Sequence, residues 1–119
     1  MTIGLSVLAL GSLAVVTGCS GNPDTTAKQA CQHVERSLRL YAQASSEPDP
    51  AAADRERVGA LVELRTALPL ASVAAAGSGQ WEALRTTLSE SPNVDESRLV
   101  HALTQQCQSA LSPPSARTY

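Results

Sequence analysis

The side chains of this chain that are best suited to bind a metal ion or to exchange electrons are its three cysteines and two histidines. His33 follows Cys31 by two positions and His101 precedes Cys107 by six, which on a helix turns each pair about 200° and about 240° apart. Neither pair has the i, i+4 spacing of a helical metal site, and the sequence has no C-x-x-C motif. We therefore expect surface or boundary histidines, no metal site and no cofactor.

Four glutamates are candidate acids for proton transfer, and each has an arginine close by in the sequence: Glu35 and Arg36, Glu63 and Arg65, Glu82 and Arg85, Glu96 and Arg98. Only Glu82 and Arg85 are spaced to form an ion pair along one helix face. The sequence contains no serine-hydrolase, zinc-protease or P-loop motif, and the turn over residues 77–79 is too short to hold a phosphate. Solvated charge explains these residues, so the sequence predicts that the protein is not an enzyme.

The N-terminal segment is apolar and carries no charged side chain before Asp24. Its apolar run, residues 3–16, has the length of a signal-peptide core and is shorter than the roughly 20 residues that cross a bilayer. At the end of this run, Val16-Thr17-Gly18-Cys19 places an aliphatic residue and two small residues before a cysteine. This segment resembles the lipobox of bacterial lipoproteins.

The resemblance implies a lipoprotein signal peptide over residues 1–18, cleavage before Cys19, and acyl chains such as palmitate on the processed cysteine. Residues 19–24 would then form a tether to the cell membrane, on its extracytoplasmic face. Two or more acyl chains make such attachment effectively permanent. No Lys or Arg precedes the apolar run, so we expect the natural start to lie upstream. The alternative is that residues 3–16 form a buried helix and that Cys19 is an ordinary thiol.

Once Cys19 is assigned to the lipid, Cys31 and Cys107 are the cysteines that remain. In an oxidising compartment outside the cytoplasm, such a pair usually forms a disulfide. The bond would close a loop of about 76 residues and stabilise the fold by about 4–5 kcal/mol in the chain-entropy model. Helical periodicity also places both cysteines on apolar helix faces, as a buried disulfide requires.

The composition favours an all-α fold. Hydrophobic residues make up 43% of the chain, yet it has one Trp, two Tyr and no Phe, so Ala, Leu and Val must form the core. Ala and Leu have high helix propensity, and no sustained alternation of β-branched residues predicts a strand. The net charge of −2, without a basic stripe, argues against a nucleic-acid partner. We expect one helical domain over residues 25–112 and a flexible tail over residues 113–119.

Four helices are expected, over residues 25–46, 51–68, 80–90 and 93–112. Asp24 or Thr25 would cap the first helix, Asp49 would cap the second, and Asn93 with Glu96 would form a capping box on the fourth. These four helices would form a small domain in which the first and last are joined by the disulfide.

The end of the second helix carries two further signals. Pro69 predicts a kink or a short break, followed by a helical piece over residues 70–76. Gly77 and Gly79 would stop that piece, because glycine accepts the left-handed backbone conformation.

Apolar residues at helical spacing define the predicted core. Its members are Ala27, Cys31, Val34, Leu38 and Tyr41 on the first helix, Val58, Leu61, Leu64 or Arg65, and Leu68 on the second with Val62 beside them, Trp81, Leu84 and Leu88 on the third, and Val100, Leu103, Cys107 and Ala110 on the fourth with Leu99 and Leu111 alongside.

Trp81 is the residue whose role the sequence leaves open. It either covers one end of a small core or forms part of a surface for a ligand or partner. The segment from Trp81 to Ser91, together with Gln106-Cys107, resembles small lipoproteins of high-GC Gram-positive bacteria, and this resemblance implies no particular activity.

The sequence leaves two hypotheses for the function of the protein. The first is a non-enzymatic lipoprotein that contacts another envelope protein or a cell-wall component. The second is a binding module for a lipid or a small hydrophobic ligand in a crevice between helices. An enclosed apolar cavity of roughly 300 Å³ or more near Trp81 would favour the ligand. A flat, uncharged patch over a filled core would favour a protein partner.

Overall fold

The computed structural model describes residues 22–111, so the predicted signal peptide, Cys19 and the predicted tail lie outside the described residues. Six helical elements follow one another: α1 (Pro23–Ser46), α2 (Pro50–Gly77), the 3-10 turn η1 (Gly79–Trp81), α3 (Glu82–Glu90), the 3-10 turn η2 (Ser91–Asn93) and α4 (Glu96–Leu111). No strand occurs between residues 22 and 111. The predicted all-α fold with four helices is confirmed, and so is the disulfide that joins the first helix to the last.

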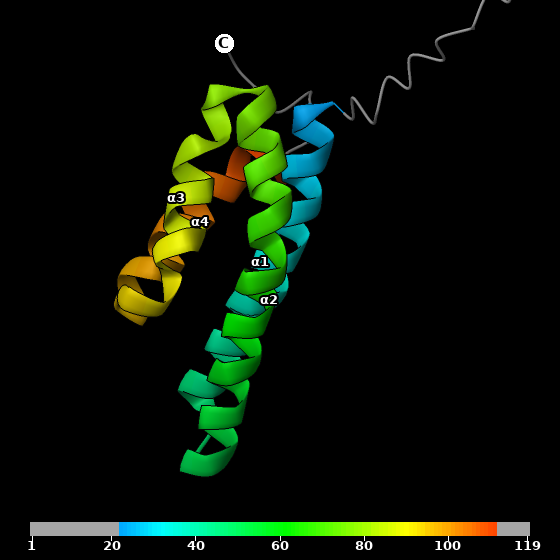
Figure 1. Ribbon diagram of the computed structural model, residues 1–119. Coiled ribbons are helices and arrows are strands. Elements are labelled where there is room, and N and C mark those ends of the chain that lie inside the picture. The colour runs from blue at the N-terminus through cyan, green and yellow to red at the C-terminus, as the bar shows by residue number, and fades with distance from the viewer. Residues whose placement is uncertain (1–21, 112–119) are drawn as a thin grey trace, which may run out of the picture.

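Two antiparallel helix pairs make up the fold (Figure 1). The long helices α1 and α2 form the first pair, and the shorter α3 and α4 pack along part of it. Within this arrangement α4 contacts α1 and α3 contacts α2. At the turn between Ser46 and Pro50, the α1–α2 pair extends beyond the second pair (Figure 1). We call this end the hairpin tip, and the opposite end, where Asn22, Gly77 and Trp81 lie, the closed end.

Side-chain caps set the starts of both long helices. The Asn22 Oδ1 accepts a hydrogen bond from the backbone N–H of Asp24 at 3.0 Å, so the prediction of Asp24 or Thr25 as the cap is wrong. Asp49 caps α2 as predicted, because its Oδ1 accepts a backbone N–H at 3.2 Å. Each cap is followed directly by a proline, whose missing N–H would have no helical acceptor in the first turn.

The second long helix continues through Pro69 to Gly77, without the break that the proline allowed. Pro69 is exposed, while Ala67 and Ala71 on either side of it are fully buried. Tertiary packing contributes more to helix stability than local propensity does. The contacts of these alanines therefore hold the helix together across one missing backbone hydrogen bond.

The buried face of α2 differs from the predicted one. Val58, predicted to lie in the core, is 61% exposed, and Leu61 and Leu68 are only partly buried. Alanines take their place, so that the buried residues of α2 are Ala53, Ala60, Leu64, Ala67, Ala71 and Ala74. Of the four residues predicted to form the core stripe of α2, only Leu64 is fully buried.

The face of α1 that meets this stripe is built in the same way. Its buried residues recur at alternating spacings of three and four, as Ala27, Ala30, Val34, Ser37, Tyr41 and Ala44, with Cys31 beside them. Most of these side chains are small, which lets the two backbones approach closely. Ser37 shows how closely, because its Oγ donates a hydrogen bond to the backbone carbonyl of Ala60 at 2.9 Å. The buried hydroxyl thus has a partner, as a polar group away from water requires.

The fourth helix begins later than predicted. Residues Ser91–Asn93 form the turn η2 and Val94 is extended, with φ −107° and ψ 139°. The backbone N–H of Leu99 then donates to the carbonyl of Asp95 at 2.9 Å, which opens the helical hydrogen-bond pattern at Glu96. The predicted capping box of Asn93 and Glu96 is therefore wrong. The faces of α3 and α4 match the prediction more closely, since Trp81, Leu84, Leu88, Leu99, Leu103, Cys107 and Ala110 are all buried. Val100 is only partly buried, and Leu111 is 37% exposed.

Gly77 ends α2 for a different reason from the one predicted. Neither Gly77 nor Gly79 adopts the left-handed backbone conformation, and the helix stops because Ser78 is extended. A Cβ atom on Gly77 would lie 2.6 Å from the Cγ of Pro23. Glycine is therefore needed here for a close approach between the end of α2 and the start of α1.

Candidate functional site

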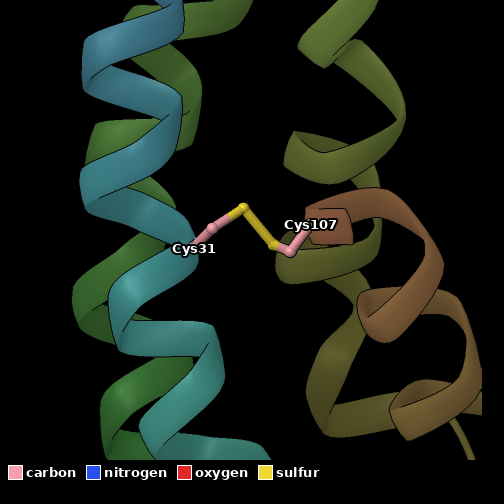
Figure 2. Close-up of a disulfide and its surroundings, with 2 residues drawn as sticks. All are labelled: Cys31 and Cys107. Carbon is pink, nitrogen blue, oxygen red and sulfur yellow. A yellow bond between two sulfur atoms is a disulfide. The ribbon is translucent and has the colours of Figure 1, made fainter. Parts of the chain in front are cut away.

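Cys31 of α1 and Cys107 of α4 form the predicted disulfide, with their Cα atoms 5.4 Å apart (Figure 2). Both cysteines are buried, and the bond joins positions 76 residues apart. It fastens the second helix pair onto the first near the closed end. Because both sulfurs are bonded, neither is a thiolate for metal binding or nucleophilic attack. The role of the disulfide is therefore structural.

The closed end is held by Asp24, in the first turn of α1. Its Oδ1 accepts hydrogen bonds from the indole Nε1 of Trp81 at 3.1 Å and from the Nε2 of Gln80 at 2.8 Å. A carboxylate near a helix N-terminus is also favourable for the helix dipole. One side chain thus ties the start of α1 to the corner between α2 and α3.

Trp81 is 5% exposed and lies at one end of the core. A pocket of about 230 Å³ lies beside it, between α3 and α4. Most of the other side chains that line it are polar, namely Gln80, Gln105, Gln106 and Ser109 alongside Ala83 and Leu84. The pocket is therefore smaller and more polar than the crevice a hydrophobic ligand would need.

The histidines lie apart from each other and from the disulfide sulfurs. His33 is at the boundary predicted for it, with 25% of its side chain exposed, and its Nδ1 donates to the Oε2 of Glu63 at 2.8 Å. This contact links α1 to α2. His101 is exposed on α4. Within residues 22–111, no group of three or more His, Cys, Asp or Glu side chains is placed to hold a metal ion.

The four glutamates all have cationic partners. Glu82 pairs with Arg85 as predicted, and the hydrogen bond from Arg85 holds the pKa of the Glu82 carboxyl below its usual value. The other three pair differently from their nearest arginines in the sequence: Glu35 with Arg39, Glu63 with His33 and Arg36, and Glu96 with Arg57. Charge pairing accounts for all four of these candidate carboxylates.

Tyr41 lies near the fourth glutamate. Burial raises the pKa of its hydroxyl above the ordinary tyrosine value, and the neighbouring Glu96 carboxylate adds to the shift. A pocket of about 370 Å³ opens beside these two residues, between α1 and α4.

The outward face of α2 is the surface that the sequence reading did not find. Val58 and Val73 are each 61% exposed and Val62 is 49% exposed, and Pro69 is exposed between them. Positions 58 and 62 are four residues apart, 62 and 69 are seven apart, and 69 and 73 are four apart, so these side chains lie on one side of the helix. We call them the valine stripe. The sequence did contain a signal for it, because α2 has two sets of apolar residues at helical spacing and only one can face α1.

The apolar character of α2 is also apparent when the helix is compared with membrane helices. Among the helices between residues 22 and 111, only α2 has the length and apolar composition of a helix that could cross a bilayer, a property that core helices of soluble proteins also have. Only 28% of its most apolar stretch is buried inside the fold. The helix is thus apolar both where it meets α1 and where it faces outward.

No protein-family model, curated protein or solved structure matches this chain.

Proposed function

We propose that this protein is a lipid-anchored module on the extracytoplasmic face of the cell membrane, that it is not an enzyme, and that it binds another envelope protein through the valine stripe. The lipobox residues Val16-Thr17-Gly18-Cys19 support the anchor. The disulfide between Cys31 and Cys107 supports an oxidising compartment, because such bonds are rare in the cytosol.

The observation that carries the proposed binding role is the exposure of Val58, Val62 and Val73 over a core that is already filled. Exposed apolar side chains that gather on one face of a fold commonly mark an interaction site. Each large apolar side chain moved from water into an interface contributes about 1.5–3 kcal/mol. Exposed aliphatic side chains of this kind fit a protein surface better than a polysaccharide, which offers mostly hydroxyl groups.

The anchor would also fix where this stripe lies. Ser20 and Gly21 separate Cys19 from the cap Asn22, and an extended chain spans at most about 3.6 Å per residue, so the closed end lies within about 11 Å of the lipid. At about 1.5 Å per helical residue, Val73 is about 6 Å and Val58 about 29 Å along α2 from Gly77. A partner on this stripe would therefore stand close to the same membrane.

Binding of a small hydrophobic ligand has weaker support. The pocket beside Trp81 has a volume of about 230 Å³ and is rich in glutamine side chains. Typical ligand sites are larger and mostly apolar. The larger pocket of about 370 Å³ beside Tyr41 is lined in part by Ser45, Glu96 and Ser97, which do not suit a hydrophobic ligand.

The anchor is tested by the intact mass of the protein isolated from the membrane fraction, with and without reductant. We expect cleavage before Cys19, added acyl mass, and a mass shift on reduction of the Cys31–Cys107 bond. The variant Cys19→Ala should leave the membrane or remain unprocessed. Fully processed Cys19→Ala protein in the membrane fraction would refute the lipid anchor.

The binding role is tested by placing a photo-crosslinking residue at Val58 or Val62 of the full chain in cells. The control position is Gln32, an exposed polar residue of α1. We expect one defined protein adduct from both valine positions and none from Gln32. Equal labelling from all three positions would show that the stripe has no specific partner.

A further inference from the structure

We propose that the partner inserts one large apolar side chain into a pocket between α2 and α3 and places a carboxylate against Arg65 at the lip of that pocket. This inference rests on the proposed function and names the chemistry of the protein segment that the α2 surface would bind.

The pocket lies next to the valine stripe. It is lined by Leu61 and Leu68 of α2, by Leu88 and Ser89 at the end of α3, and by the turn at Ser91 and Pro92, with Arg65 also in its wall. Leu61 adjoins Val62 in the sequence, and at about 100° per helical residue Arg65 lies between the pocket and the stripe, so the two are neighbouring surfaces. We call this combined surface the α2–α3 patch.

The size of the pocket limits what can enter it. Its volume is about 170 Å³, whereas pockets for small molecules and cofactors have about 300–1,000 Å³. One leucine, methionine or phenylalanine side chain fits such a space, and an acyl chain or an aromatic cofactor does not. Buried anchors of this kind in well-packed pockets contribute much of the binding energy of protein interfaces.

The charge at the lip identifies the second contact. Arg65 is exposed, and no acidic side chain between residues 22 and 111 forms an ion pair with it. Arg36, Arg39 and Arg57 of the long helices are paired. Arg55 of α2 also has no ion pair among residues 22–111, but it does not line the pocket. An unpaired guanidinium beside an apolar pocket is complementary to a carboxylate, which it can hold with two parallel hydrogen bonds.

The backbone of α2 offers a further acceptor at the same place. Pro69 has no N–H, so it cannot donate to the carbonyl of Arg65 one turn earlier. The apolar pocket and the unpaired Arg65 together identify the partner. It is a protein segment in which an apolar residue and an Asp or Glu lie within about one helical turn of each other.

The test uses the full-length, membrane-anchored protein in cells, with the photo-crosslinking residue p-benzoylphenylalanine at Ser89. This exposed position lines the pocket opposite Arg65 and leaves the valine stripe intact. We expect a protein adduct whose crosslinked peptide contains an acidic residue beside a large apolar one. Replacing that acidic residue in the partner by Arg should abolish the adduct, and combining this change with Arg65→Glu should restore it.

Three substitutions separate charge from packing. Arg65→Glu should lower the adduct yield at least about fivefold, because it replaces attraction with repulsion. Arg65→Lys keeps the charge but loses the two parallel hydrogen bonds, so its yield should lie between those of the parent protein and of Arg65→Glu. The matched control is Arg98→Glu on α4, which changes another exposed arginine that has no ion pair among residues 22–111 and should leave the yield unchanged. All these positions are exposed, so each variant should fold.

The remaining outcomes contradict the inference in distinct ways. An adduct with lipid or with a second copy of this chain would replace the proposed partner class. A protein adduct at Ser89 that is insensitive to Arg65→Glu would refute the carboxylate contact and leave the proposed function in place. Loss of specific adducts at Ser89, Val58 and Val62 together would refute the proposed function itself.

Discussion

The indole N–H of Trp81 donates a hydrogen bond to the carboxylate of Asp24, although the two residues lie 57 positions apart in the chain. The same oxygen of Asp24 accepts a second hydrogen bond from Gln80. One side chain in the first turn of α1 thus fixes the corner at which the chain passes from α2 into α3. Trp81 covers this end of the core, with its ring buried and its polar atom satisfied.

Removing this carboxylate should loosen the closed end. We expect Asp24→Ala to lower the free energy of unfolding by about 1–2 kcal/mol, because two side-chain hydrogen bonds are lost. The chain has one Trp, so denaturation can be followed by the emission of Trp81, which should also shift to the red in the variant. Glu90→Ala, at an exposed site, should stay within about 0.5 kcal/mol of the parent protein. An unchanged denaturation midpoint for Asp24→Ala would show that the contact adds no stability.

The disulfide should supply a large part of the total stability. We expect the double variant Cys31→Ala and Cys107→Ala to lose about 4–5 kcal/mol, from a loop of 76 positions. Domains of this kind are stable by only about 5–15 kcal/mol in total. The measurement is denaturant unfolding with and without reductant. Reductant should destabilise the parent protein and leave the double variant unaffected, and equal sensitivity of the two would contradict this account.

Gly77 and Gly79 provide a matched pair of substitutions. Alanine is a better helix former than glycine, so propensity alone predicts that Gly77→Ala stabilises α2. The new Cβ would lie 2.6 Å from Pro23, so we expect a loss of about 1–3 kcal/mol instead. Gly79→Ala meets no atom within 4 Å and should be neutral or slightly stabilising. The melting temperatures of both variants test this prediction. Stabilisation by Gly77→Ala would show that the end of α2 and the start of α1 can move apart without a loss of stability.

Tyr41 predicts a loss of stability in alkaline solution. Burial and Glu96 raise the pKa of its hydroxyl in the folded state, so the unfolded chain releases this proton first. Fewer protons bound in the unfolded state mean that stability falls as the pH rises above about 10. Urea unfolding at pH values between about 8 and 11 measures the slope of the free energy of unfolding against pH. Tyr41→Phe should reduce that slope and leave stability near neutral pH almost unchanged, and an identical slope in both proteins would refute this assignment.

Local sequence signals located most of the helix boundaries. Asp49 followed by Pro50 marked the start of α2, and Gly77 marked its end. The starts of α1 and α4 were misplaced because several polar residues in a row could each act as the cap. Asn22 and Asp95 hold those positions in the structure, whereas the sequence favoured Asp24 and Asn93.

The candidate site was only partly visible in the sequence. Cys31 and Cys107 were paired correctly because two independent arguments, cysteine count and helical periodicity, agreed. The α2–α3 patch was missed because its valines had been assigned to the core. Its pocket combines Leu61 and Leu68 with Leu88 and Pro92, and no spacing rule within one helix relates such residues.

The sequence by itself determined that this protein is helical and where most of its helices lie, because these properties depend on local propensity, caps and periodicity. It also determined which cysteines pair, because cysteine count and periodicity agreed. Which side of α2 faces inward was decided only by the tertiary structure. Both sides carry apolar residues at helical spacing, and transfer from water alone favours burying Val58 and Val62 over Ala60 and Ala67. The alanines are buried because the opposing face of α1 is also made of small residues. Close packing of the two backbones, as in the hydrogen bond from Ser37 to Ala60, stabilises the fold more than burial of the larger side chains would.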